Sequence, residues 1–286
     1  KGAGLYVDRA SGVEMEDVTI LKNQAWSVFG ILTDSDTSDE RQRREGECRD
    51  RNGKKDFNDF AVARYGVFIG CKKPSGYGSD EASLSYGGGI FLNNVTANVL
   101  KTHNVEVREN QAAVGGGVNV NNSNTILSNI DIISNVASSR GGGIAANGYS
   151  AQTLTLRAMN VKNNYAGEKP DTGENKYEDG YGGGISASKM ILKFDGANTI
   201  KGNKAASGGG ISLGKAQLLG EISDNSTISE NIAVRGGGIF AVESDTNQGT
   251  GCVEQDVIIE RILLSNNKAR GGAGISVAAK CAEVHN

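Results

Sequence analysis

The strongest constraint on the fold of this 286-residue chain is a pair of short motifs that repeats along it. The first motif is a glycine triplet followed by Ile or Val, and its successive copies begin 28, 26, 41, 26, 28 and 35 residues apart. The second precedes the triplets and reads apolar-x-x-Asn-x-Ala. Because both motifs keep their order through seven copies, they indicate stacked structural repeats. The repeated asparagines are Asn23, Asn110, Asn135, Asn164, Asn203, Asn231 and Asn267, and the corresponding glycines are Gly88, Gly116, Gly142, Gly183, Gly209, Gly237 and, in a Gly-Gly-Ala-Gly variant, Gly272.

Short strands fill the sequence between these motifs. Apolar, often β-branched residues fall two apart, as in residues 105–107 and 130–132, and no helical period extends over three turns. A repeat of 26 to 28 residues suits one coil of two or three strands, which must stack on the next coil to bury its apolar face. We therefore predict an all-β fold, a right-handed parallel β-helix (single-stranded solenoid) over residues 1–286, with seven or eight coils and a length of roughly 35 to 40 Å.

The motifs have a physical meaning in such a stack. An inward Asn at the same corner of every coil can form a hydrogen-bonded ladder that satisfies its buried amide. The Ala two positions later fits a narrow interior, and the glycines permit positive φ and close backbone approach. The alternative is that the asparagines are surface turn residues, which would keep the fold and remove the ladder.

Three insertions interrupt the repeat without removing its motifs. They cover residues 34–83, 167–180 and 243–255, and we expect them to be loops that project from the stack, where binding sites of repeat proteins often lie. The first contains Asp34, Asp36, Asp39 and Glu40, whose alternate oxygens are a weak calcium candidate. A solvated acidic loop is the expected state, and no cofactor is predicted.

The cysteines and the possible glycosylation signals both bear on the cellular compartment in which the protein is found. Cys48, Cys71, Cys252 and Cys281 lack the spacing of a zinc site, and the simplest of the three possible pairings is Cys48–Cys71 with Cys252–Cys281. Four free thiols in a cytosolic protein are the alternative. Asn94, Asn121 and Asn225 begin Asn-x-Ser/Thr sequences, which are possible glycosylation sites in a secreted protein.

The repeat resembles that of the chlamydial polymorphic membrane proteins. Their motifs are Gly-Gly-Ala followed by Ile, Leu or Val, and Phe-x-x-Asn; here residues 141–144 and 236–239 follow residues 132–135 and 228–231 in the same order. This chain has Gly in place of the Ala, and Ile, Val or Leu in place of the Phe. The resemblance implies a β-helical, surface-exposed passenger of an autotransporter or adhesin.

These observations favour a non-catalytic extracellular module. A net charge of −3 gives no basic face for nucleic acid, no apolar stretch is long enough for a membrane span, and we expect the chain to be part of a larger protein. Acids do not recur at equivalent repeat positions, as a polysaccharide lyase or hydrolase would require; Asp131, Asp195, Asp224 and Asp256 have different contexts, and His103 and His285 are isolated.

The expected partners are a host-surface protein, a glycan that contacts a stripe of Arg140, Arg235 and Arg270, or other copies through the coil ends. The alternatives are a subunit of an extracellular filament and a carbohydrate-active enzyme.

Overall fold

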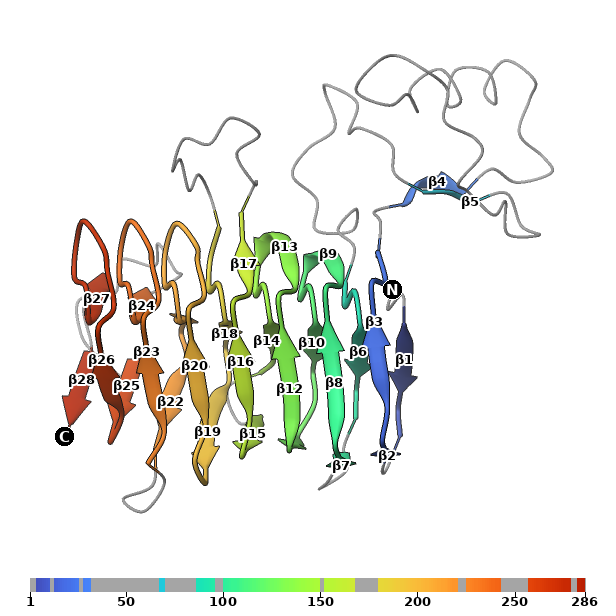
Figure 1. Cartoon of the computed structure of the whole chain (residues 1–286), viewed down its shortest axis with the longest axis horizontal. Coiled ribbons are helices and arrows are strands. Elements are labelled where there is room, and N and C mark those ends of the chain that lie inside the picture. Colours follow the sequence, from blue (N-terminus) through green and yellow to red (C-terminus); the bar gives the residue numbers. More distant parts are fainter. Residues whose placement is uncertain are drawn as a thin grey trace, which may run out of the picture. The chain divides into compact units, whose positions relative to one another are not determined.

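The computed structural model describes residues 4–10, 13–25, 28–31, 67–69, 86–95, 100–149, 152–167, 180–220, 225–242, 257–278 and 282–285. These residues contain strands and no helix, and all but one pair of the strands run parallel to each other (Figure 1). The prediction of a parallel β-helix is therefore confirmed. The chain separates into two compact units, one formed by residues 1–25 and 86–286 and the other by Trp26–Ser85. In the second unit, β4 (Val28–Ile31) and β5 (Val67–Ile69) form an antiparallel pair.

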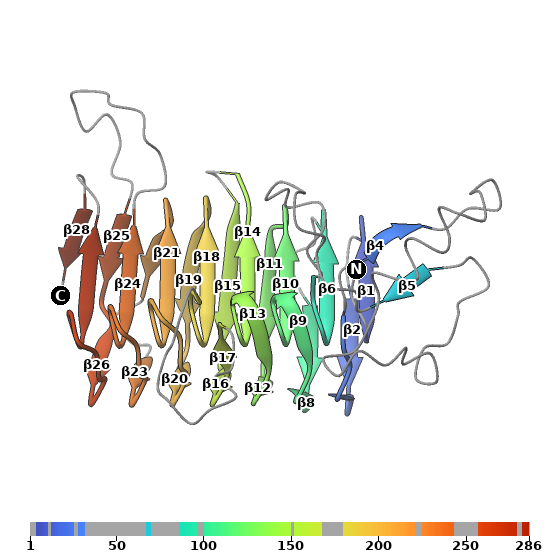
Figure 2. The same ribbon diagram turned by 90° about the horizontal axis from the view of Figure 1, so that it is seen from above.

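Three long parallel sheets form the β-helix (Figures 1 and 2). Seven successive coils contribute one strand to each sheet, and the described residues after them add β27 (Ile275–Ala278) to the first sheet and β28 (Ala282–His285) to the second. Sheet A contains β1 (Leu5–Asp8), β6 (Ile90–Asn93), β10 (Val118–Asn121), β14 (Ile144–Asn147), β18 (Ile185–Ser188), β21 (Ile211–Gly214), β24 (Ile239–Val242) and β27 (Ile275–Ala278). Sheet B contains β2 (Val13–Glu16), β7 (Leu100–His103), β11 (Thr125–Ser128), β15 (Thr153–Arg157), β19 (Ile191–Asp195), β22 (Gln217–Leu219), β25 (Val257–Glu260) and β28 (Ala282–His285).

Sheet C is followed in each coil by a shorter segment that carries the repeated asparagine. Sheet C contains β3 (Thr19–Leu21), β8 (Val105–Arg108), β12 (Ile130–Ile133), β16 (Asn160–Lys162), β20 (Thr199–Lys201), β23 (Thr227–Ser229) and β26 (Leu263–Ser265). After it, β9 (Gln111–Val114), β13 (Val136–Arg140) and β17 (Tyr165–Ala166) form a small fourth sheet along the upper edge of Figure 1. Isolated bridges such as Tyr165↔Lys204 and Lys204↔Ile232 continue this line through the later coils.

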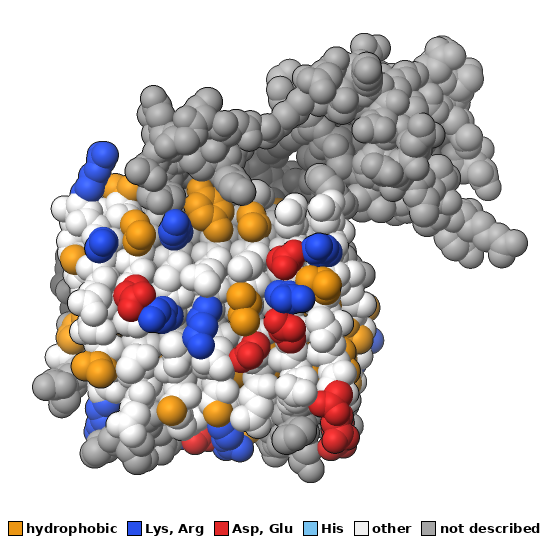
Figure 3. All heavy atoms as spheres, viewed as in Figure 1, with side chains coloured by type: hydrophobic (Ala, Val, Ile, Leu, Met, Phe, Trp, Pro, Cys, Tyr) orange, Lys and Arg blue, Asp and Glu red, His pale blue; other side chains and the backbone are white. Residues whose placement is uncertain are grey.

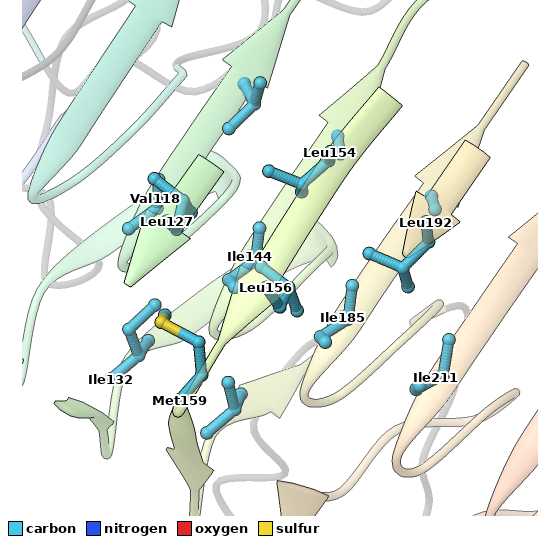
Figure 4. Packing of buried hydrophobic residues seen from close by; sticks show 14 of the residues in the cluster. Val118, Leu127, Ile132, Ile144, Leu154, Leu156, Met159, Ile185, Leu192 and Ile211 are labelled. Atoms are coloured by element: carbon cyan, nitrogen blue, oxygen red, sulfur yellow. The ribbon is translucent and has the colours of Figure 1, made fainter. Parts of the chain in front are cut away.

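The core is a set of apolar columns that run along the axis. Equivalent residues stack in register, as in Val118↔Ile144↔Ile185↔Ile211 of sheet A, and all four are fully buried. Leucines of sheet B meet them from the opposite wall (Figure 4). Because each coil is only a few residues across, its apolar side chains are covered mainly by the coils before and after it. Stacking is thus what supplies the core.

The corners between sheets use left-handed backbone conformations. The residue before each repeated Asn has positive φ in every coil, for example 55° at Glu109, 56° at Ser134 and 67° at Gly202. A side chain in this conformation is strained, and glycine or asparagine relieves the strain. The abundance of Asn and Gly therefore reflects these corners as well as the two motifs.

The first two glycines of each triplet have different tasks. The first has positive φ, as Gly141 does at 66°, and turns the chain into sheet A. The second has no such φ but lies against the next coil, since a Cβ on Gly142 would lie 2.4 Å from the Tyr165 carbonyl oxygen and 2.5 Å from that of Gly183. Separations that short are repulsive, so the second glycine is required by the distance between the coils.

Replacing the second glycine of a central triplet is expected to destabilise the stack. Gly142→Ala should lower the free energy of unfolding by about 2 to 3 kcal/mol, because its methyl group meets backbone that cannot move without shifting a coil. The control is Gly214→Ala in β21, where the nearest atom, the Ser188 Oγ, is 3.6 Å from the added Cβ. The control should stay within about 1 kcal/mol of wild type in urea unfolding. Equal losses for the two variants would contradict this role.

Candidate functional site

The repeated asparagines form one continuous hydrogen-bonded column inside the β-helix. Six side chain to side chain bonds link all seven residues from Asn23 to Asn267 at 3.0 Å each. Asn110, Asn135, Asn203 and Asn231 have no exposed surface. The surface-turn alternative therefore does not apply, and the inward ladder is present.

Each interior side chain of the asparagine ladder makes four hydrogen bonds. The Oδ1 of Asn135 accepts from the backbone N–H of Asn110 at 2.9 Å and from its Nδ2 at 3.0 Å. The Nδ2 of Asn135 donates to the Asn164 Oδ1 at 3.0 Å and to the carbonyl oxygen of Val107 at 2.9 Å. Val107 lies three positions before Asn110, so the apolar residue of the motif gives its side chain to the core and its carbonyl to the next rung. This geometry explains the spacing apolar-x-x-Asn.

The third glycine of each triplet makes room for the ladder. A Cβ on Gly117 would lie 2.9 Å from the Asn135 Nδ2, and a Cβ on Gly143 would lie 3.0 Å from the Asn164 Nδ2. The two sequence motifs therefore meet in one contact. The Asn motif of one coil supplies the amide, and the glycine triplet of the preceding coil leaves the space that the amide occupies. The sequence analysis did not assign this task to the third glycine.

Loss of one ladder side chain is expected to cost far more than loss of an outer asparagine. Asn135→Leu removes the only hydrogen-bond acceptor of the buried Asn110 N–H and one partner each of three further groups. A buried group without a partner costs about 1 to 3 kcal/mol. As the control, Asn160→Leu removes one exposed bond to Asp131. Thermal unfolding should rank Asn135→Leu well below the control, and similar melting temperatures would refute the role of the ladder.

The predicted acids lie apart on the outer surface or outside the described residues, and the two histidines end different strands. Asp131 accepts a hydrogen bond from Asn160 on sheet C, whereas Asp195 pairs with Arg157 on sheet B. His103 ends β7 and His285 ends β28. Asp224 and Asp256 lie outside the described residues. Among the described residues, no three His, Cys, Asp or Glu side chains gather closely enough to hold a metal ion.

The possible glycosylation sites lie at corners or strand ends. Asn94 and Asn225 have positive φ, and the Nδ2 of Asn121 donates to the Asn93 Oδ1 at 2.8 Å. The Ser123 hydroxyl donates to the Asn121 carbonyl and is fully buried. Glycosylation at the three sites stays a prediction. The four cysteines, the acidic run at Asp34, Asp36, Asp39 and Glu40, and most of the three predicted insertions lie outside the described residues.

In the β-helix unit, one edge is formed by the described residues that follow each repeated Asn, up to the end of the glycine triplet. These residues include cations and no acids. The predicted stripe lies here, and bridges place Arg140, Tyr181, Ser207 and Arg235 in one column. Arg270 stands one position out of that column, because it is Gly271 that pairs with Arg235. Lys204 and Lys268, which the sequence analysis did not single out, lie on the same edge directly after their ladder asparagines. Their signal was the recurring sequence Asn-Lys-Ala.

No protein-family model matches the chain, and a search of curated proteins and of solved structures finds no similar protein. Within the described parts of the chain, no helix is long and apolar enough to cross a membrane.

Proposed function

We propose that this chain is a non-catalytic scaffold module of an extracellular surface protein, which presents inserted segments for binding. The observation that carries the proposal is that the stack keeps its register across an insertion. Asn23 and Asn110 are 87 positions apart in the sequence, yet they occupy adjacent rungs of the ladder, and Leu5 pairs with Ile90 in sheet A.

The position of the insertions supports the same role. The unit Trp26–Ser85 and the segment 168–179 both enter between a ladder Asn and the following glycine triplet. The repeat therefore accepts extra chain at the same corner of different coils while the core columns continue. The third insertion, 243–255, enters at another corner, between β24 and β25. A frame that accepts insertions at its corners suits a protein whose inserted segments bind a partner, such as a host-surface protein or a glycan. The resemblance of the motifs to those of a bacterial surface repeat agrees with this role.

The extracellular location is tested by labelling intact cells of the source organism with antibodies against the purified chain. We expect labelling without permeabilisation. Labelling that appears only after permeabilisation would contradict the proposal.

The non-catalytic role is tested by incubating the purified chain with a panel of polysaccharides and following their length by size-exclusion chromatography. We expect no shortening. Depolymerisation that is lost on replacing Asp131 or Asp195 would establish the enzyme alternative. Electron microscopy of the same sample separates discrete particles, which we expect, from the filaments of the other alternative.

A further inference from the structure

We propose that a cationic edge on the C-terminal coils binds a linear anionic polysaccharide along the axis of the stack. The cationic edge consists of Lys204, Arg235, Lys268 and Arg270. The inference rests on the proposed function, because it names the partner class of the scaffold, and it assigns binding to the frame itself in addition to the inserted segments.

The four cations come from three consecutive coils. Lys204, Ile232 and Lys268 pair in one bridged column, and Arg235 pairs with Gly271, the neighbour of Arg270, in a second column. Stacked strands lie about 4.8 Å apart, so Lys204 and Lys268 are separated by roughly 10 Å along the axis. Figure 3 shows basic side chains along the upper left margin, over the C-terminal coils. The charges therefore form a line parallel to the axis.

These cations keep their charge unneutralised by the described part of the chain. All four side chains are exposed, and none forms a salt bridge with a described acid. Several cations elsewhere on the β-helix form such salt bridges, as in Lys201–Glu230 at 3.0 Å and Arg261–Glu260 at 3.5 Å. The cationic edge thus concentrates positive potential on a chain whose net charge is −3.

One of the two guanidinium groups of the cationic edge is held in place before any ligand binds. The Arg235 Cζ lies 5.1 Å from the centroid of the Phe240 ring, which is buried in sheet A. A cation over an aromatic face keeps the N–H donors at its rim free for carboxylate or sulfate oxygens. Because the side chain is already ordered, less conformational entropy is lost on binding.

The arrangement favours a polysaccharide over a folded acidic protein. Positions repeat with the spacing of the coils, so a ligand with anionic groups at regular intervals can meet several cations at once. Tyr181 is 40% exposed in the column of Arg235 and offers a ring face on which a sugar can pack. Several weak charge contacts on one linear ligand add to a useful affinity through multivalency.

The test measures binding of fluorescein-labelled heparin and polygalacturonate to the whole chain by fluorescence anisotropy, with dextran as the neutral polymer. We expect both anionic polymers to bind, more weakly as NaCl rises, and dextran not to bind. In the edge variant all four residues of the cationic edge are replaced, Lys204→Gln, Arg235→Gln, Lys268→Gln and Arg270→Gln. Its affinity for both polymers should fall roughly tenfold or more.

The matched control removes the same charge from other faces by Lys162→Gln, Lys189→Gln, Lys201→Gln and Arg261→Gln. It should bind within about twofold of wild type, and circular dichroism checks that both variants fold. If the edge variant does not fold, the single replacements of Lys204 and Lys268 take its place, and each should weaken binding.

The inference is wrong if the wild-type chain does not bind, or if the edge variant and the control lose the same affinity. It is also wrong if binding is unchanged in the edge variant or, where that variant does not fold, in the two single variants. Equally tight binding of polyglutamate through the same residues would overturn it as well. The length of the recovered polysaccharide is measured in the same samples. Shortening would contradict the non-catalytic role, whereas edge-independent binding would contradict only the inference.

Discussion

The whole structure depends on one contact between coils. In this contact the amide of a buried asparagine fills the space that is open because the residue opposite, a glycine, has no side chain. Asn135 lies against Gly117, and Asn164 lies against Gly143. Neither partner is sufficient alone. The asparagine supplies hydrogen bonds to a backbone N–H that faces no strand partner, and the glycine permits the approach that makes those bonds short enough. Repeated along the stack, this contact fixes the register of three sheets whose strands are only three to five residues long.

Because this contact joins neighbouring coils, it also explains how the β-helix accommodates inserted sequence. The register is carried by contacts between coils, so the length of chain that connects a ladder asparagine to its triplet matters little. The cost of closing a loop rises only slowly with its length, and sixty inserted residues can be accepted where four would do. Variation at that corner leaves the core unaffected, which is the property that a presenting scaffold needs.

The sequence predicted the stack and the column of asparagines because both repeat at visible intervals. It did not separate the tasks of the three glycines, since the second and third act through atoms of the neighbouring coil, as Gly142 does against Tyr165 and Gly117 against Asn135. It also did not show that Arg270 stands one position out of the column of Arg235, although the Gly-Gly-Ala-Gly variant places one more residue between Arg270 and Ile275 than lies between Arg235 and Ile239. The same holds for Lys204 and Lys268, which become neighbours of Arg235 only in the folded stack. Left-handed corners at Glu109 and Ser134 were not predicted either, because neither residue type favours that conformation.

Amide hydrogen exchange measured by NMR tests the central claim most directly. The backbone N–H and the Nδ2 protons of Asn135 and Asn164 should exchange as slowly as the backbone amides of the neighbouring core strands, since all of them open only when coils separate. The Nδ2 protons of Asn160, which make a single exposed bond, serve as the internal reference and should exchange quickly. Fast exchange of the ladder amides, at the rate of Asn160, would show that the column does not hold the coils together.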